Sequence, residues 1–275
     1  MPSVPELQDD HVPMPLALDR ERLRVLLYGE YGRGKSTLAG SFPKPLIIDT
    51  NGGLKALALS GVVADTFVPT GHEDLEALYY WIKERSADYE TIVIDTLDSL
   101  TALLMDEITD DAVSFKTEDR SRRVSLRMRF VPEQGDYYAS QRQMRRFLTD
   151  LRRLGKHIVI TSGQRTEYGT NGPDVSKGMS SVVRDWADIV GELVIIDDVD
   201  DDELPDGTGD VPTSGCRLLW TDEANGRSTK ARFNRMKPYI VEPTFEKISA
   251  LIEAEYRSAT NGGKTADTGA AGRNK

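Results

Sequence analysis

The sequence predicts a single α/β domain with a mostly parallel central sheet and helices on both faces. Five short apolar runs rich in β-branched residues recur along the chain: LRVLLY, PLIID, TIVID, HIVIT and ELVII. Runs of this kind suit strands that are buried on both faces of a parallel sheet. Helix-like patterns separate them, and strands that alternate with helices are typical of βαβ units.

Two of the intervening segments have the 3.6-residue period of an amphipathic helix. In residues 72–86 the apolar face comprises Leu75, Leu78, Tyr79 and Ile82. In residues 138–155 it comprises Met144, Phe147, Leu148, Leu151 and Leu154, and Gly155 suits a helix C-cap. A last helix is expected over residues 245–256.

The late part of the chain departs from this alternation. Two runs within 216–234 flank Asn225 and Gly226, a pair that favours a β-hairpin near the C-terminal edge of the sheet. Residues 1–20 are rich in proline and poor in apolar periodicity, so we expect a flexible arm. Residues 258–275 are small, polar and glycine-rich, and are expected to be disordered. The predicted domain therefore spans residues 21–257.

The composition excludes several classes of protein. No apolar run approaches the roughly 20 residues that cross a bilayer, and the acidic, proline-rich N-terminus does not resemble a signal peptide. The single cysteine, Cys216, excludes an intramolecular disulfide. We expect a cytoplasmic protein with no membrane partner.

The formal charge of −10 is unevenly distributed along the chain. Residues 197–210 contain eight acids and no base, whereas residues 116–153 contain eleven Lys and Arg against five Asp and Glu. Local patches rather than net charge decide electrostatic contacts, so a nucleic-acid partner stays open.

Residues 29–36 read GEYGRGKS and match the phosphate-loop pattern G-x-x-x-x-G-K-[ST] at every position. A strand-like run precedes the loop and a helix-like run follows it, as this motif requires. Backbone N–H groups of such a loop surround phosphates, Lys35 would reach the β- and γ-phosphates, and Ser36 would ligate Mg²⁺. The predicted ATP–Mg²⁺ site comprises Gly29, Glu30, Tyr31, Gly32, Arg33, Gly34, Lys35, Ser36 and Thr37.

Two later strand ends carry polar groups for the same site. The run TIVID ends at Asp95, where a carboxylate would lie in the crevice at the carboxyl edge of the sheet and organise Mg²⁺. A helix N-cap, shared with Asp98, is the alternative role. Gln164 follows the run HIVIT and would face the γ-phosphate; a solvated strand end is the alternative.

Taken in order, YGEYGRGKSTLAGSFPKPLIIDTNGGL, YETIVIDTLDSL, HIVITSGQ, VVRDWADIVGEL and TKARFNR resemble the phage P-loop AAA-domain ATPases with a RecA-type core. These include the single-strand-annealing recombination ATPases of phages, relatives of RecA and RadA. The resemblance covers most of residues 21–256. It implies a RecA-like fold, ATP hydrolysis, single-stranded DNA binding and an oligomer of identical subunits. It also makes a single-strand-binding protein a candidate partner.

The resemblance assigns three further roles. Gln164 would couple the γ-phosphate to a mobile DNA-binding loop over residues 165–181. Lys230 and Arg232 match a K-x-R pair that reaches a neighbouring subunit's nucleotide, and residues at i and i+2 of a strand point the same way. A solvated strand face is the alternative for that pair. Asn51 replaces the glutamate that polarises the attacking water, so hydrolysis is either slow or served by the carboxylate of Asp49 or Glu30.

The basic middle of the chain is a candidate DNA surface. Arginine forks bind phosphates and aromatic rings stack on bases, and the region interleaves both. The candidate contacts are Lys116, Arg120, Arg122, Arg123, Arg127 and Arg129, together with Arg165 and Lys177 of the later loop. The arginines of the 138–155 helix are more simply explained as a solvated face.

Two other functions fit a phosphate loop. A nucleotide or small-molecule kinase would use an arginine-bearing lid, a role open to the cluster at 120–129. A nucleotide-held assembly module would need little hydrolysis, which Asn51 favours. The K-x-R pair and the loop after Gln164 favour the DNA-dependent ATPase.

Overall fold

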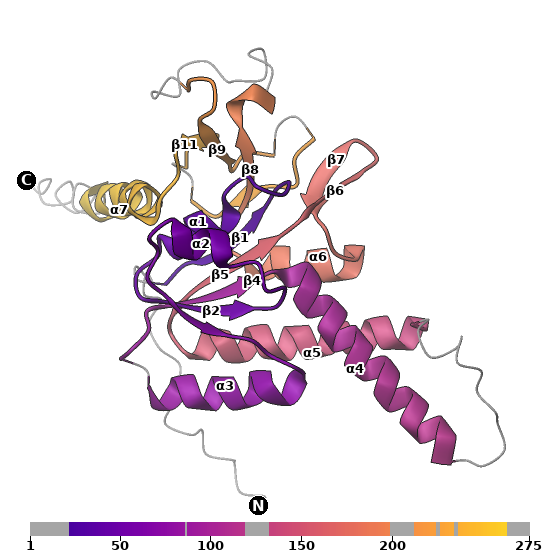
Figure 1. The fold of residues 1–275 in the computed structure, drawn as a ribbon. Helices are drawn as coiled ribbons and strands as arrows, with labels where there is room; N and C mark the ends of the chain where they lie inside the picture. Colours follow the sequence, from indigo (N-terminus) through magenta and orange to yellow (C-terminus); the bar gives the residue numbers. More distant parts are fainter. Residues whose placement is uncertain are drawn as a thin grey trace, which may run out of the picture.

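The computed structural model describes residues 22–85, 87–118, 132–198, 212–223, 226–233 and 236–262. A nine-stranded sheet forms its centre, with helices on both faces (Figure 1). The expected α/β fold with a mostly parallel sheet is confirmed.

Six parallel strands form the larger part of the sheet. In spatial order they are β3 (Asp65–Phe67), β2 (Pro45–Asp49), β4 (Thr91–Asp95), β5 (His157–Ser162), β1 (Arg24–Tyr28) and β8 (Ile189–Ile195). The edge beyond β8 is antiparallel and comprises β9 (Arg217–Trp220), β11 (Tyr239–Val241) and the short β10 (Lys230–Ala231). β5 therefore separates β1 from β4, and the loops after these three strands meet at one edge of the sheet.

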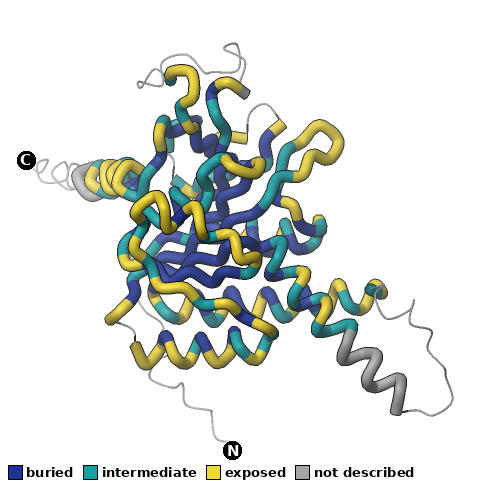
Figure 2. Tube along the Cα trace, in the orientation of Figure 1, coloured by how far each residue is buried: buried dark blue, intermediate teal, exposed yellow. Residues whose placement is uncertain are grey.

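The helices divide between the two faces of the sheet. One face carries α3 (His72–Glu84), α4 (Leu97–Glu118), α5 (Gln134–Arg153) and α6 (Lys177–Trp186). The other carries α1 (Lys35–Gly40), α2 (Lys55–Leu59) and α7 (Phe245–Gly262). The central strands β2, β4 and β5 are buried along their length, whereas the edge strand β3 is largely exposed (Figure 2).

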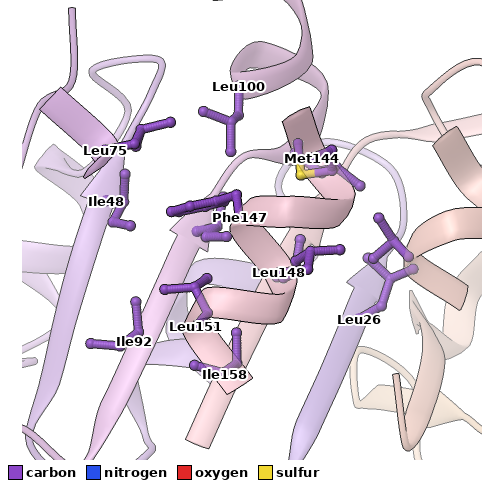
Figure 3. Packing of buried hydrophobic residues seen from close by; sticks show 14 of the residues in the cluster. Leu26, Ile48, Leu75, Ile92, Leu100, Met144, Phe147, Leu148, Leu151 and Ile158 are labelled. Carbon is purple, nitrogen blue, oxygen red and sulfur yellow. The ribbon is translucent and has the colours of Figure 1, made fainter. Parts of the chain in front are cut away.

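Alternation along β1 explains why its residues from Val25 to Tyr28 are all hydrophobic. Leu26 and Tyr28 join the core under α5 and α6, whereas Val25 and Leu27 join the core under α1 and α7. Successive side chains of a strand point to opposite faces, so a strand that is covered on both sides needs no polar position. Figure 3 shows the first of these cores, where Met144 and Leu148 of α5 pack toward the sheet.

The hairpin expected over 216–234 does not form among the described residues, because the two runs pair with other strands and not with each other. β9 pairs antiparallel with β8 and β11, while β10 pairs with β8 and not with β9. Gly226 has a left-handed φ of 69° and packs against the carbonyl of Gly169, where an added Cβ would lie 2.6 Å from that oxygen. A glycine is therefore needed at position 226 because two backbone segments approach each other closely there. The Asn-Gly pair in the sequence does not distinguish such an approach from the turn of a hairpin.

Three expectations about irregular segments also change or go untested. The loop expected over 165–181 is instead an antiparallel hairpin of β6 (Gln164–Glu167) and β7 (Thr170–Pro173), followed by α6. Helix α7 continues to Gly262, into the tail expected from residue 258. The expected N-terminal arm over residues 1–20 and the rest of the tail lie outside the described residues. None of the described helices has the length and apolarity needed to cross a membrane.

Candidate nucleotide-binding site

The phosphate loop joins β1 to α1 at the carboxyl edge of the parallel strands, where open α/β sheets bind ligands. Gly34, the last glycine of the motif, has a φ of 90° and directly precedes the helix. At the other end of the loop, a Cβ on Gly29 would lie 2.4 Å from the carbonyl oxygen of Leu193 in β8. Both positions require glycine, one because of its dihedral angle and one because of space.

Lys35 holds the loop closed and carries its charge into the site. Its Nζ donates to the carbonyl oxygens of Gly29 and Glu30, at 2.8 Å each. Burial lowers the pKa of this amine, and the carboxylates of Asp95 and Asp98 oppose that shift. The lysine, the loop and the carboxylates that follow β4 therefore form one electrostatic unit.

Asp95 is buried at the end of β4, and its Oδ1 accepts a hydrogen bond from the hydroxyl of Thr161 on β5. Asp98, the second residue of α4, accepts from the backbone N–H of Gly163 at 3.1 Å. Ser36 is half-buried at the second position of α1. A hydroxyl and carboxylates are the oxygen ligands that Mg²⁺ prefers, so this donor set fits the expected ion.

The turn after β2 is held by hydrogen bonds between its own residues. Asp49 lies beside Asp95 in the sheet, and its Oδ1 accepts from the N–H groups of Gly52 at 2.8 Å and Asn51 at 3.2 Å. The exposed Asn51 accepts from Gly53 at 2.8 Å. Glu30 forms a 2.6 Å ion pair with Arg33. Each side chain considered for the water-activating step therefore already has a protein partner.

Gln164 begins β6, and one residue separates it from the end of β5, the strand that lies between β1 and β4 in the sheet. Its Oε1 is buried, and no donor in the described part of the chain reaches it. A buried amide oxygen without a partner is costly, so an incoming hydrogen-bond donor would be favoured there.

The predicted DNA contacts divide into three groups. Arg165 and Lys177 line one groove between the β6–β7 hairpin and α6, which the fully exposed Tyr168 also lines. Lys116 belongs to helix α4 instead of a loop. Arg120, Arg122, Arg123, Arg127 and Arg129 lie outside the described residues.

Lys230 and Arg232 lie away from the chain's own phosphate loop. Lys230 pairs with Val190, opposite Leu26 in the middle of β1, and Arg232 lies beside Asp188, next to Arg24 at the amino end of β1. Lys230 Nζ donates to the carbonyls of Arg184 at 2.7 Å and Ala187 at 2.9 Å. Burial, and then the charge of Arg232, lower the pKa of Lys230.

Arg232 contacts the same turn between α6 and β8. It donates to the carbonyl of Asp185 at 2.6 Å and lies 3.4 Å from the carboxylate of Asp188. Its side chain is nevertheless 45% exposed. Of the two cations, only Arg232 keeps substantial access to solvent.

Sequence reasoning missed two residues at this site. Asp98 was considered only as a helix cap, although its charge acts on Lys35. Arg217 comes from β9, and its side chain lies against Gly34. The Asp-x-x-Asp spacing around 95–98 could have suggested the first, but no local signal marks the second.

A family model described as "AAA domain" matches residues 21–233, a range that includes the phosphate loop and the strand that ends in Asp95. The chain belongs to this AAA domain family. Its parallel sheet, flanking helices and intact phosphate loop are those of a P-loop NTPase fold, as the sequence predicted.

Other comparisons give more distant similarities. No curated protein matches the sequence. The crystal structure of the RadB recombinase is 15% identical, with 79% of this chain and 86% of that chain covered and a TM-score of 0.42. A KaiC-like protein from Pyrococcus horikoshii OT3 is 13% identical, with 80% and 89% covered and a TM-score of 0.40.

Proposed function

We propose that this AAA-domain protein is an ATPase that binds single-stranded DNA and promotes annealing or strand pairing in phage DNA recombination. The observation that carries the proposal is the gathering of Lys35, Asp95 and Asp98 around an intact phosphate loop. Lys35 would exchange its bonds to loop carbonyls for phosphate oxygens. Ser36 and Asp95 would hold Mg²⁺, which supplies charge neutralisation on the phosphates when it is bound.

The groove between the β6–β7 hairpin and α6 supports the DNA part of the proposal. Arg165, Lys177 and Arg184 line it, and Tyr168 offers an exposed ring for base stacking. Arg165 and Arg184 also contact Glu167 and Glu223 on the surface. DNA phosphates would compete with these carboxylates, so binding should weaken steeply with salt.

ATP turnover with and without single-stranded DNA, followed by sizing of the complex, tests the proposal. We expect turnover that DNA stimulates, oligomers in the active sample, and loss of both nucleotide binding and turnover in Lys35→Ala. DNA affinity should fall linearly on a log–log plot against salt. Binding that ignores salt, or turnover that ignores DNA, would contradict the DNA role.

The same measurements separate the alternatives. Phosphorylation of a small molecule without DNA would indicate a P-loop kinase. Nucleotide binding that assembles the protein without turnover would indicate an assembly module. Asn51, which has no carboxylate, is the observation that keeps the assembly module in consideration.

A further inference from the structure

Arg217 lies beside the phosphate loop although 182 residues of sequence separate it from Lys35. It begins β9, where it pairs with Ile195 of β8. β8 in turn runs past the end of β1, and its Leu193 carbonyl contacts Gly29 at the start of the loop. Because β9 pairs with β8 and β8 pairs with β1, the first residue of β9 lies beside the phosphate loop.

The Arg217 side chain lies directly against the last glycine of the loop. A Cβ on Gly34 would be 3.1 Å from its Nε, 3.2 Å from its Cδ and 3.3 Å from its Cζ. Gly34 precedes Lys35, so the guanidinium adjoins the segment whose N–H groups surround phosphates in such loops. A side chain at position 34 would therefore require the arginine to shift slightly.

The backbone of Arg217 is fixed on both sides. Its N–H donates to Oε1 of Glu242 at 2.9 Å, and its carbonyl accepts from the Glu242 N–H at 2.8 Å. Pairing with β8 holds the other edge of the residue. The fixed backbone therefore sets the point from which the Arg217 side chain reaches Gly34.

The charge of Arg217 has no protein partner in the part of the chain that the structure describes. By contrast, Arg33 of the loop pairs with Glu30, and Arg227, which packs on the ring of Trp220, pairs with Glu192. A planar guanidinium without a carboxylate, next to a phosphate loop, matches the geometry of phosphate oxygens.

We propose that Arg217 binds the phosphates of the nucleotide from within the same subunit. This inference rests on the proposed nucleotide site and adds a cation to it. The contact differs from that predicted for Lys230 and Arg232, which would act on a neighbouring subunit. Arg217 contributes to affinity by a charge-assisted hydrogen bond, independent of DNA and of assembly.

Competition against a fluorescent ADP derivative tests the assignment on the full chain, with ADP and inorganic tripolyphosphate as competitors. Arg217→Ala should weaken both competitors by a similar factor of about 10 to 100, the range for a hydrogen bond to a charged group. Arg217→Lys should recover part of the loss, because it keeps the charge without the fork. Arg257→Ala removes an exposed arginine of α7 and should change nothing.

Three results would overturn the inference. If Arg217→Ala binds both competitors with wild-type affinity, the nucleotide site exists but Arg217 does not contribute to it. Weaker binding of ADP with unchanged tripolyphosphate would place the arginine on the base or the ribose. Failure of the wild-type protein to bind either probe would remove the nucleotide site itself. Matching thermal unfolding of the three variants and the wild type establishes that each is folded.

Discussion

At the scale of single residues, the carboxylate that activates water is the open step of the proposed hydrolysis. Asn51 stands where the resemblance expects a glutamate, and its carbonyl is bonded to Gly53. Asp49 uses its Oδ1 to hold the turn after β2. Asp98, whose charge reaches Lys35, becomes a third candidate that the sequence did not propose.

The substitution Asn51→Glu should raise ATP turnover, since a carboxylate can accept the proton of the attacking water and an amide cannot. General-base assistance raises the rate by about 10²–10⁴-fold in enzymes. We expect an increase at the lower end of this range, because the surroundings of position 51 are not adapted to a glutamate. Nucleotide affinity should stay near the wild-type value, because Asn51 is exposed and lies outside the phosphate loop. Single-turnover hydrolysis and ADP competition measure the two quantities, and Asn51→Gln is the matched control.

Unchanged turnover in Asn51→Glu would mean that another carboxylate already holds the water. Asp49→Asn and Asp98→Asn would then identify it, since only one of them should abolish turnover while nucleotide binding persists. Glu30 is a weaker candidate, because its exposed side chain already pairs with Arg33.

Local sequence predicts the phosphate loop and Asp95 because each is a short motif at a strand end. It cannot predict Arg217, whose approach to Gly34 depends on the pairing of β9 with β8 and of β8 with β1. Nor does it predict that the Asp49 carboxylate accepts hydrogen bonds from the turn that follows β2. Which residues of different strands become neighbours depends on the order and register in which the strands pair. A short sequence motif does not specify that pairing.

At the scale of elements, a buried polar cluster connects the β6–β7 hairpin to the strand that ends in the phosphate loop. Glu192 of β8 pairs with Arg227 at 2.9 Å, and both side chains are buried. Asn171 of the hairpin donates to the same carboxylate at 2.9 Å, and Arg227 lies over the ring of Trp220.

Tyr28 completes this cluster from β1. Its hydroxyl donates to the Asn171 carbonyl and accepts from the Ser228 N–H. Burial, and then Glu192, raise the pKa of the Tyr28 hydroxyl, so it keeps its proton. Because Tyr28 directly precedes Gly29, the hairpin after Gln164 and the phosphate loop share one rigid support.

The substitution Glu192→Gln should destabilise the fold by about 3 kcal/mol, because it leaves the Arg227 charge buried without its counter-charge. The isosteric amide keeps an acceptor for Asn171, so the loss reports on the ion pair. Urea unfolding measures it. Arg227→Met should cost a similar amount, and the double variant should cost less than the sum of the two. Additive losses would show that the two side chains act independently.

Element-scale prediction succeeded where both faces of a strand or one face of a helix had to be apolar. It failed where a segment is short and exposed. The 165–181 segment forms a hairpin through pairs such as Arg165 with Gly172, although its polar and glycine-rich composition indicates a loop. Helix α5 begins at Gln134 with a capping box between Glu133 and Asp136, ahead of the apolar period that predicted it.

At the scale of the whole molecule, the K-x-R pair bears on whether two subunits share one ATPase site. Lys230 caps the carbonyls at the end of α6, which gives it a role within the subunit. Arg232 is nearly half exposed and lies toward the opposite end of β1 from its own phosphate loop. If either cation reaches a neighbour's nucleotide, Arg232 is the better placed.

Mixing two inactive variants tests this shared site. Arg232→Ala should lose turnover and keep nucleotide affinity, whereas Lys35→Ala should lose both. In a mixed oligomer, a phosphate loop from the Arg232→Ala subunit can face an intact Arg232 on the Lys35→Ala subunit. We therefore expect the mixture, with single-stranded DNA present, to regain turnover that neither variant has alone. Turnover no greater than the sum of the separate variants would instead place the complete ATPase site within one subunit.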